Sequence, residues 1–520
     1  IAFVFAFAVS YGMGANDACN DWGTSVGAGT VKLWQAYILC AIFNTLGAVL
    51  LGYKVTETIR TGIVDVSVYD VYVQYEPGNN TYVIVPFCEV ANDTLETTTF
   101  APPPLPVGNE TNIVDCARYT SADFMYGQVG TLLGVSVFMI VSSVFKIPVS
   151  ATHAIVGATL ASTLYLKGNN GIKWLEIGGI VLSWFISPLL AGFVSSFFYL
   201  IVKFSVLMRR HTFEAALKLC PVFMAFTLTV NLFACIFDGS KCELICNSNP
   251  IESTEICKQI FLRTNIMNNR DKIRWLRARA HRLYERDLKK QQKKKQDPES
   301  SPETLSSNVI DVSFTVVDGE RKQLPVGEIE PPPGPWYCYI RKNVTEDPLA
   351  AKVFNSVQMV SASLLSFSHG ANDTANTVGP LVAIWLTYRT GWALTDASER
   401  ADMQYLLLFG AVAMIVGFAT LGHRTMKLIA KEITTEVSAP SGFTVELGTA
   451  FTVLFCAKLG IPISSTHCAV GAVLFVGMTK STSEGVDWRV FGKIVVVWLL
   501  CFPISALISF IMTVILYNFV

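Results

Sequence analysis

Six apolar runs of about 20 residues constrain this chain more than any other feature of its sequence. They cover residues 33–51, 124–144, 177–202, 217–237, 405–421 and 495–519. A helix needs about 20 apolar residues to cross roughly 30 Å of hydrocarbon. The runs are continuous rather than alternating, which argues against a membrane β-barrel. They predict an all-α polytopic membrane protein.

The charged residues are concentrated in one part of the chain. Only 15% of the 520 residues are charged, against about 25% in an ordinary soluble domain. Residues 262–350 alone hold 17 of the 40 Lys and Arg and 13 of the 40 Asp and Glu. We therefore expect a first transmembrane repeat (1–237), a polar stretch and loop (238–350), and a second transmembrane repeat (351–520). The net charge is zero, so the composition offers nothing to attract nucleic acid.

Two loops predict how the chain is oriented. The polar loop 65–120 carries three Asn-x-Thr sequons, at Asn79, Asn92 and Asn109. Glycosylation requires an extracellular or lumenal face, so we expect this loop outside. Cys88 and Cys116 in the same loop form either a disulfide on an oxidising face or two unpaired thiols.

The loop 262–350 begins with a strongly basic stretch. Thirteen Lys and Arg fall between Arg263 and Lys295, against three acidic residues. Basic segments beside a membrane stay in the cytoplasm, so this loop is predicted to be cytoplasmic. The stretch is either a solvated charged helix or a contact for anionic lipid.

The chain also contains an internal duplication. Residues 14–20 read GANDACN and residues 370–376 read GANDTAN; residues 147–153 read IPVSATH and residues 461–467 read IPISSTH. Chance matching at two places in the same order is improbable. The chain therefore consists of two related halves, each with an Asn-Asp motif and a Pro-Ser-Thr-His motif.

The Asn-Asp motif has the chemistry of a cation site. Asp17 and Asp373 end apolar segments, where an ionised carboxylate is costly, and no Lys or Arg lies beside either in sequence. Carboxylate, amide and freed backbone oxygens together form a cage for a hard cation such as sodium. The alternative is an Asp that caps a helix at the membrane interface.

The Pro-Ser-Thr-His motif predicts a helix start that suits an anion. Proline is favoured in the first turn, and helix N-termini attract negative charge. The apolar segments that follow, 154–166 and 468–478, are short enough to predict re-entrant hairpins. His153 and His467 either donate to the anion or serve in packing. Two inverted repeats with re-entrant helical hairpins around a midplane site describe a secondary transporter for an anion.

At these motifs the chain resembles the inorganic phosphate transporter family, the sodium–phosphate cotransporters of the PiT type. The segments 57–60 (ETIR) and 440–447 (PSGFTVEL) match further family blocks. The resemblance implies a sodium-coupled symporter that imports phosphate across the plasma membrane, with sodium ions as coupling ions and no other cofactor. It implies sodium held by Asp17 and Asp373, and a sodium- and phosphate-binding set comprising Asn16, Asp17, Asn20, Asn44, Ser150, Thr152, Asn372, Asp373, Asn376, Glu446, Ser464, Ser465 and Thr466.

The sequence departs from the family pattern in two places. The family has a glutamate in a block like IFETxG, as the first-half counterpart of Glu446, where this chain has Asn44 in IFNTLG. Asn44 offers an oxygen ligand but no charge. Residues 238–262 are polar where the family has another apolar helix.

Several alternatives remain open at this level. The coupling ion is sodium or protons, and the substrate is phosphate or another oxyanion such as sulfate. A receptor that has lost transport is a further reading. An intramembrane hydrolase built on Ser150 and His153, or on Ser464 and His467, is disfavoured because no nucleophile elbow surrounds either serine. A homodimer is compatible with the sequence, although no residue specifies one.

Overall fold

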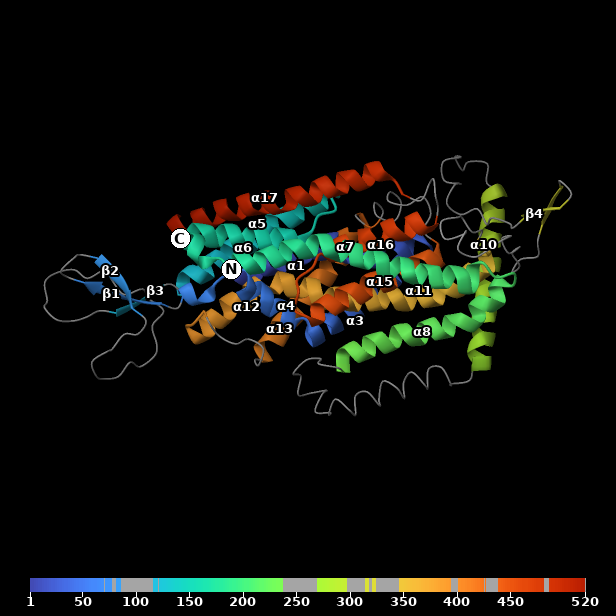
Figure 1. Cartoon of the computed structure of the whole chain (residues 1–520), viewed down its shortest axis with the longest axis horizontal. Coiled ribbons are helices and arrows are strands. Elements are labelled where there is room, and N and C mark those ends of the chain that lie inside the picture. Colours follow the sequence, from blue (N-terminus) through green and yellow to red (C-terminus); the bar gives the residue numbers. More distant parts are fainter. Residues whose placement is uncertain are drawn as a thin grey trace.

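The computed structural model shows a long helical bundle with two small sheets at its ends (Figure 1). It describes residues 1–69, 71–76, 81–85, 116–119, 121–236, 269–296, 314–317, 320–323, 346–393, 401–424, 426, 438–480 and 486–519. The prediction of an all-helical membrane protein is confirmed for the bundle. The exceptions are the antiparallel sheets β2-β1-β3 and β4-β5.

The helices follow in the order of the two sequence halves. The first half contains α1 (Ala2–Asn16), α2 (Ala18–Gly27), α3 (Leu33–Leu51), α4 (Tyr53–Glu57), α5 (Ser121–Val144), α6 (Ala151–Lys167), α7 (Trp174–Val202) and α8 (Thr212–Ile236). Then come α10 (Asn269–Gln296), α11 (Pro348–His369), α12 (Ala375–Thr390), α13 (Ala401–Gly417), α15 (Ala439–Lys458), α16 (Ser465–Lys480) and α17 (Trp488–Phe519). The strands are β1 (Val71–Glu76), β2 (Thr81–Val85), β3 (Cys116–Tyr119), β4 (Phe314–Val317) and β5 (Glu320–Gln323).

Seven helices within the described ranges are long and apolar enough to cross a membrane. They are Leu33–Leu51, Ser121–Val144, Trp174–Leu207, Thr212–Val230, Asp402–Gly422, Ala439–Lys458 and Trp488–Phe519. Six coincide with the six predicted runs. The seventh, α15, was not predicted because its first two turns carry Pro, Ser, Thr and Glu, which dilute its hydropathy. The chain is therefore a multi-pass membrane protein.

Two helical hairpins enter the bundle from opposite ends. The α5–α6 hairpin starts at the end that holds β1–β3 and both termini, and an Asp123–Lys167 ion pair of 3.2 Å closes its base (Figure 1). The α15–α16 hairpin starts at the other end, near α10, where Lys480 pairs with Glu346 at 3.4 Å. Residues 124–144, which look like an independent span in sequence, thus form the first arm of a hairpin.

The two halves repeat the same packing pattern. The contacts of α6 and α5 with α17 have counterparts in the contacts of α16 and α15 with α7. The contact of α1 with α13 likewise has a counterpart in that of α11 with α3. α1 begins at the end with the termini, whereas α11 begins at the end near α10 (Figure 1). The first helices of the two halves therefore enter the bundle from opposite ends, which is the arrangement that inverted repeats produce.

Glycines allow α3 to touch α11 directly, and α13 to touch α1. A Cβ at Gly47 would lie 1.8 Å from the carbonyl oxygen of Phe367, and one at Gly417 would lie 1.9 Å from that of Tyr11. Both obstacles are backbone atoms, so they cannot rotate away as a side chain would. The contacts require glycine, as is common where membrane helices approach closely.

We expect Gly47→Ala to destabilise the protein strongly. Overpacking costs about 1–3 kcal/mol where side chains can yield, and here the obstacle is backbone. The apparent melting temperature of the purified chain in detergent measures the effect. Gly492→Ala is the control, because a Cβ there meets nothing within 4 Å. Equal melting temperatures for the two variants would contradict the close approach of α3 and α11.

Candidate functional site

The Asn-Asp motifs lie where long helices are interrupted. α1 ends at Asn16, Asp17 is a single turn residue with φ of −101°, and α2 begins at Ala18. In the second half, residues Gly370–Thr374 form a π-helical turn between α11 and α12. Such interruptions expose backbone groups that a regular helix would bond internally. The motif side chains are thereby directed toward the hairpins.

The first asparagine of each motif binds the tip of the hairpin in its own half. Asn16 Nδ2 donates to the carbonyl of Ile147 at 2.8 Å, and the backbone N–H of Val149 donates to Asn16 Oδ1 at 3.1 Å. In the second half, Asn372 Nδ2 donates to the carbonyl of Ile463 at 2.8 Å. One amide side chain thus positions each tip.

The last asparagine of each motif contacts the hairpin of the opposite half. Asn20 Nδ2 donates to Thr466 Oγ1 at 3.2 Å. Asn376 Nδ2 donates to Thr152 Oγ1, also at 3.2 Å. The two bonds are related by the repeat, and they join the halves into one site.

The motif carboxylates of both halves accept hydrogen bonds from hydroxyl groups at the start of α16. Thr466 Oγ1 donates to Asp17 Oδ1 at 3.3 Å, and Ser465 Oγ donates to Asp373 Oδ2. Asp17 is 2% exposed and Asp373 is 1% exposed. Among the described residues, neither carboxylate pairs with a Lys or Arg. Cations ligated by these oxygens would compensate these charges.

The two hairpin tips meet each other. Ser150 Oγ donates to Ser464 Oγ at 3.0 Å, and Thr152 Oγ1 donates to the carbonyl of Ile463 at 3.0 Å. The N-termini of α6 and α16 therefore converge, and each presents N–H groups that have no acceptor within its own helix. Converging helix N-termini with hydroxyl groups suit a compact anion.

We call the region where the hairpin tips meet the Asn-Asp motifs the polar chamber. Glu446 forms a second polar cluster beside it. It is completely buried on α15. Its carboxylate accepts four hydrogen bonds from neutral groups, namely Thr24 Oγ1 (2.5 Å), Ser25 Oγ (2.6 Å), Gln358 Nε2 (3.1 Å) and Ser361 Oγ (2.6 Å). Neutral donors leave the negative charge uncompensated. The cluster therefore has the composition of a further cation site.

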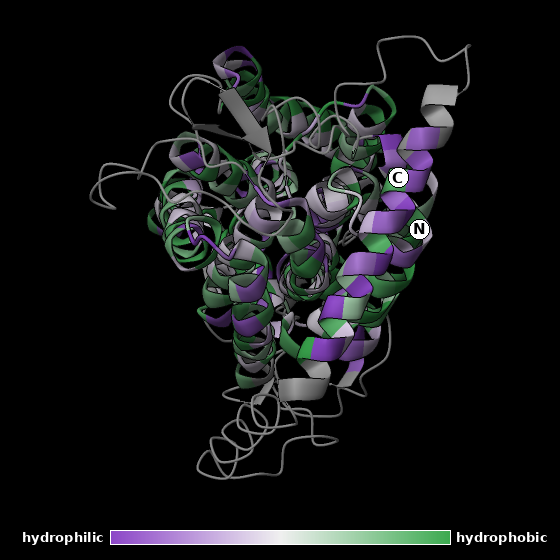
Figure 2. Ribbon diagram, turned by 90° about the vertical axis from the view of Figure 1, so that its right-hand side faces the viewer, coloured by the Kyte–Doolittle hydropathy of each residue, from purple (hydrophilic) through white to green (hydrophobic). Residues whose placement is uncertain are grey.

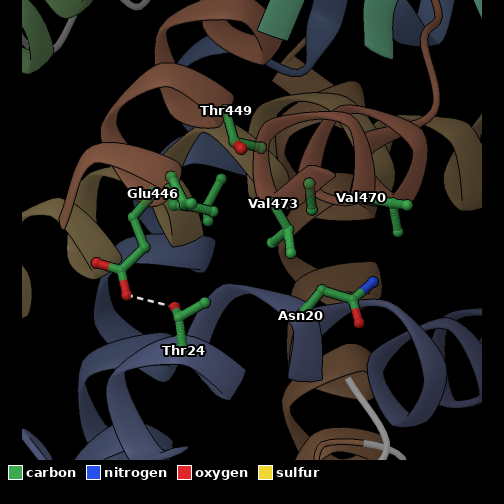
Figure 3. Close-up of a pocket in the computed structure, with 9 residues that line it drawn as sticks. Asn20, Thr24, Glu446, Thr449, Val470 and Val473 are labelled. Atoms are coloured by element: carbon green, nitrogen blue, oxygen red, sulfur yellow. Dashed lines mark hydrogen bonds between the residues drawn. The ribbon is translucent and has the colours of Figure 1, made fainter. Parts of the chain in front are cut away.

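A small cavity lies between Glu446 and Asn20, the last asparagine of the first motif. It is lined by Asn20 and Thr24 from α2, by Glu446 and Thr449 from α15, and by the valines of α16 (Figure 3). Thr449 Oγ1 is buried and has no hydrogen-bond partner in the part of the chain that the structure describes. The cavity thus joins two groups of oxygen ligands that lie far apart in sequence.

The sequence reasoning missed a histidine between two carboxylates. The Nδ1 atom of His369 lies 3.4 Å from Asp21 Oδ2, and its Nε2 atom contacts Asp373 Oδ2. Neither contact meets the geometry of a hydrogen bond, so His369 lies between the two carboxylates without bonding either. The repeat counterparts of His369 and Asp21 are Met13 and Thr377, and so the comparison of halves gave no signal. A buried Asp one turn after Asp17 was the available clue.

The sequence-level pairing of Asn44 with Glu446 is wrong. Gly14 packs on the carbonyl of Met414 and Gly370 packs on that of Asn44, so Asn44 and Met414 are the repeat counterparts. Asn44 donates to Met414 Sδ at 3.6 Å, and its Oδ1 atom lacks a partner among the described residues. Asn44 therefore lies where α3 touches the second-half motif, and it is not among the hydrogen-bond partners of Glu446.

The motif histidines bond to the backbone of the opposite half. The Nδ1 atoms of His153 and His467 contact the carbonyls of Trp498 and Trp184 at 3.1 and 3.2 Å. Each ring also lies within 3.8 Å of a tryptophan ring centroid. Ser150 is bonded by the backbone N–H of His153 rather than by its imidazole. These contacts favour a packing role and leave a hydrolase reading without a serine–imidazole pair.

Some predicted features lie outside the described residues. These are the sequon residues Asn79, Asn92 and Asn109, residue Cys88, the side chain of Cys116, and the polar stretch 238–262. The further family block at 57–60 is described: Arg60 Nη2 pairs with Glu57 at 2.6 Å and Arg60 Nη1 donates to the carbonyl of Ala393 at 3.0 Å.

Two halves that share one polar chamber inside an apolar bundle define a membrane carrier rather than an enzyme. The model of the phosphate transporter family matches residues 13–93 and 96–509. The chain belongs to this family. That assignment confirms the resemblance seen in the motifs.

The curated relatives and a solved structure agree with this assignment. Rat sodium-dependent phosphate transporter 1 is 26% identical over 98% of this chain and 94% of its own length. Sodium-dependent phosphate transporter 2 of the cat is 26% identical over 98% of this chain and 96% of its own length. A solved structure titled the sodium-dependent phosphate transporter matches with a TM-score of 0.70 and 25% identity, over 100% of this chain and 98% of that one.

Proposed function

We propose that this chain is a sodium-coupled symporter that imports inorganic phosphate across the plasma membrane by alternating access. Membership of the phosphate transporter family and relatives named for sodium dependence support the substrate and the coupling ion. The observation that carries the mechanism is the convergence of both motif pairs on one chamber, where Asn20 bonds Thr466 and Asn376 bonds Thr152. The two transmembrane repeats that would form this carrier are residues 1–237 and 351–520.

Sodium would bind at the motif carboxylates. Asp17 and Asp373 supply charge, and the amide oxygens of the motif asparagines complete an oxygen cage. Glu446, with its ring of hydroxyl and amide groups, would hold a further cation. Asp17 and Glu446 are buried and have no ion-pair partner among the described residues, whereas Asp373 contacts His369. Negative charge is costly in this environment unless a cation binds.

Phosphate would bind between the hairpin tips. Ser150, Ser464 and Thr152 are bonded to each other or to backbone in this structure, so the anion would replace those bonds with its own oxygens. Ser465 and Thr466 lie in the first turn of α16 and donate to the motif carboxylates, and so they would link the anion to the cations. Sodium at the carboxylates would offset the repulsion between phosphate and aspartate.

The orientation that we propose for the chain in the membrane follows from its loops. The end that holds β1–β3 would be extracellular, with glycans on Asn79, Asn92 and Asn109, and the end that holds the basic α10 would be cytoplasmic. We expect glycosidase to reduce the apparent mass of the chain expressed in animal cells. Replacing the three asparagines with glutamine should remove that shift. A shift that persists in the triple variant would contradict the placement of glycans on this loop.

Radiolabelled phosphate uptake into proteoliposomes tests the function. The protein should accumulate phosphate when sodium is outside and should not do so when choline replaces sodium. Excess sulfate should leave the uptake unchanged. Uptake in choline driven by an inward proton gradient would favour proton coupling, competition by sulfate would indicate a broader oxyanion carrier, and no uptake by folded protein would favour a receptor.

Asn44 allows the number of charged ligands to be tested. Its Oδ1 atom is a buried acceptor without a partner in the described ranges, at the contact between α3 and the second-half motif. We expect Asn44→Glu to lower the half-maximal sodium concentration about ten-fold, because cation sites tighten as ligand charge increases. Asn44→Leu should raise it. Sodium dependence that is unchanged in both variants would place Asn44 outside the cation site.

A further inference from the structure

The basic helix α10 lies across one end of the bundle. Its axis runs across the long helices (Figure 1), and it carries 12 Lys and Arg against three acidic residues. Arg277 Nη2 pairs with Glu214 Oε1 in the first turn of α8, at 2.6 Å. Lys352 Nζ pairs with Asp287 Oδ2 at 2.6 Å near the start of α11. α10 is thus fixed at the level where the span of α8 begins, which is the headgroup region of a membrane.

One face of α10 is packed against the bundle. Leu276 and Ala280 are buried in the main core, and Ile273 and Tyr284 pack against it. These four residues recur every three or four positions and therefore form one stripe of the helix. The stripe fixes which face of α10 points away from the protein.

The opposite face presents cations and one tryptophan. Trp275 is 51% exposed, and the Arg279 guanidinium lies 5.0 Å from its ring centroid. Arg282, Arg286 and Lys289 are exposed, and none of them pairs with another described residue. The spacing of these residues places them on the same side as Trp275. Figure 2, seen from that end, shows α10 as a largely hydrophilic helix along one edge of the bundle.

We propose that this face of α10 binds the anionic headgroups of the surrounding leaflet, with phosphatidylserine as the reference lipid. Three unpaired cations at headgroup depth complement the negative surface of such a leaflet, and an exposed tryptophan beside them is typical of the membrane interface. The position of α10 in the plane of the membrane, at the edge of the bundle, gives neighbouring lipids access to all of them. A soluble polyanion could bind these cations at any distance from the membrane, so the position of α10 at headgroup depth favours a lipid.

Titration of the full chain with short-chain phosphatidylserine in a neutral detergent tests the proposal. Neutralising the face with Arg282→Gln, Arg286→Gln and Lys289→Gln together should weaken binding about 100-fold, since each cation contributes roughly five-fold. These side chains do not pack on the bundle, so the variant should retain its melting temperature and its phosphate uptake in neutral vesicles. Raising the salt concentration should weaken binding by the unaltered chain.

The control removes two cations elsewhere at the same end. Arg489 and Lys493 are exposed on the first turns of α17, which starts at the same end of the bundle as α10. The pair Arg489→Gln and Lys493→Gln should bind the lipid as the unaltered chain does. Unchanged binding in the triple variant, or equal losses in triple and control, would overturn the proposal. So would tighter binding of soluble poly-glutamate, or equal binding of glycerophosphoserine without acyl chains.

Discussion

Asp17→Asn and Asp373→Asn should each abolish sodium-driven phosphate uptake. Each change keeps the shape of the side chain and one acceptor oxygen but removes the charge that would hold sodium. Loss of one charge from a buried, hydrogen-bonded ion pair costs about 2–5 kcal/mol, or roughly 30- to 4,000-fold in affinity. Uptake at a fixed sodium concentration should therefore fall to the level of empty vesicles in both variants.

The control for these variants is Asp487→Asn. Asp487 is exposed and caps α17 through Oδ1, which accepts from Arg489 N at 2.9 Å. Asparagine caps helices as well as aspartate does, so uptake should be unchanged. Both site variants should also elute as monodisperse protein, which separates a binding defect from misfolding. Normal sodium-driven uptake by either folded site variant would contradict the role given to that carboxylate.

Glu446→Gln should cause the second largest loss. The four neutral donors around the carboxylate can all bond a glutamine oxygen or rotate to accept from its amide, so the cluster keeps its geometry. What disappears is the negative charge. We expect the half-maximal sodium concentration to rise at least 30-fold, because the loss again corresponds to about 2 kcal/mol or more.

A sodium titration separates this effect from damage to the phosphate site. At saturating phosphate, the variant should require more sodium, whereas Glu176→Gln on the exposed first turn of α7 should behave as the unaltered chain. Ser361→Ala should give an intermediate shift, since it removes one of the four donors. A Glu446→Gln variant with normal sodium dependence and reduced phosphate affinity would move Glu446 from the cation site to the anion site.

Much of this architecture could be predicted because the repeated motifs consist of residues that have few other roles in an apolar segment. Asp17 and Asp373 are isolated carboxylates in apolar surroundings, and Ser150 and Ser464 follow a proline at a helix start. Their duplication predicted one composite site. In the structure Ser150 bonds Ser464, and the two carboxylates accept from the neighbouring residues Thr466 and Ser465. The apolar runs predicted six of the seven candidate spans because hydropathy is a local property.

The rest depended on contacts between distant segments. His369 and Asp21 are 348 residues apart, and neither has a chemically similar counterpart in the other half. α15 carries polar residues because it is surrounded by protein rather than lipid, so its composition hid a helix of spanning length. The pairing of Asn44 with Glu446 failed because it compared motif blocks by family role, whereas glycine contacts reveal which helices are equivalent.

An anomalous-scattering crystal structure with sodium and arsenate tests the central claim most directly. Arsenate has the shape and charge of phosphate, and its arsenic atom can be located without ambiguity. The account predicts one arsenic peak between the N-termini of α6 and α16, within hydrogen-bond range of Ser150, Thr152, Ser464 and Thr466. An arsenic peak elsewhere in the protein, with the two hairpin tips still bonded to each other, would contradict it.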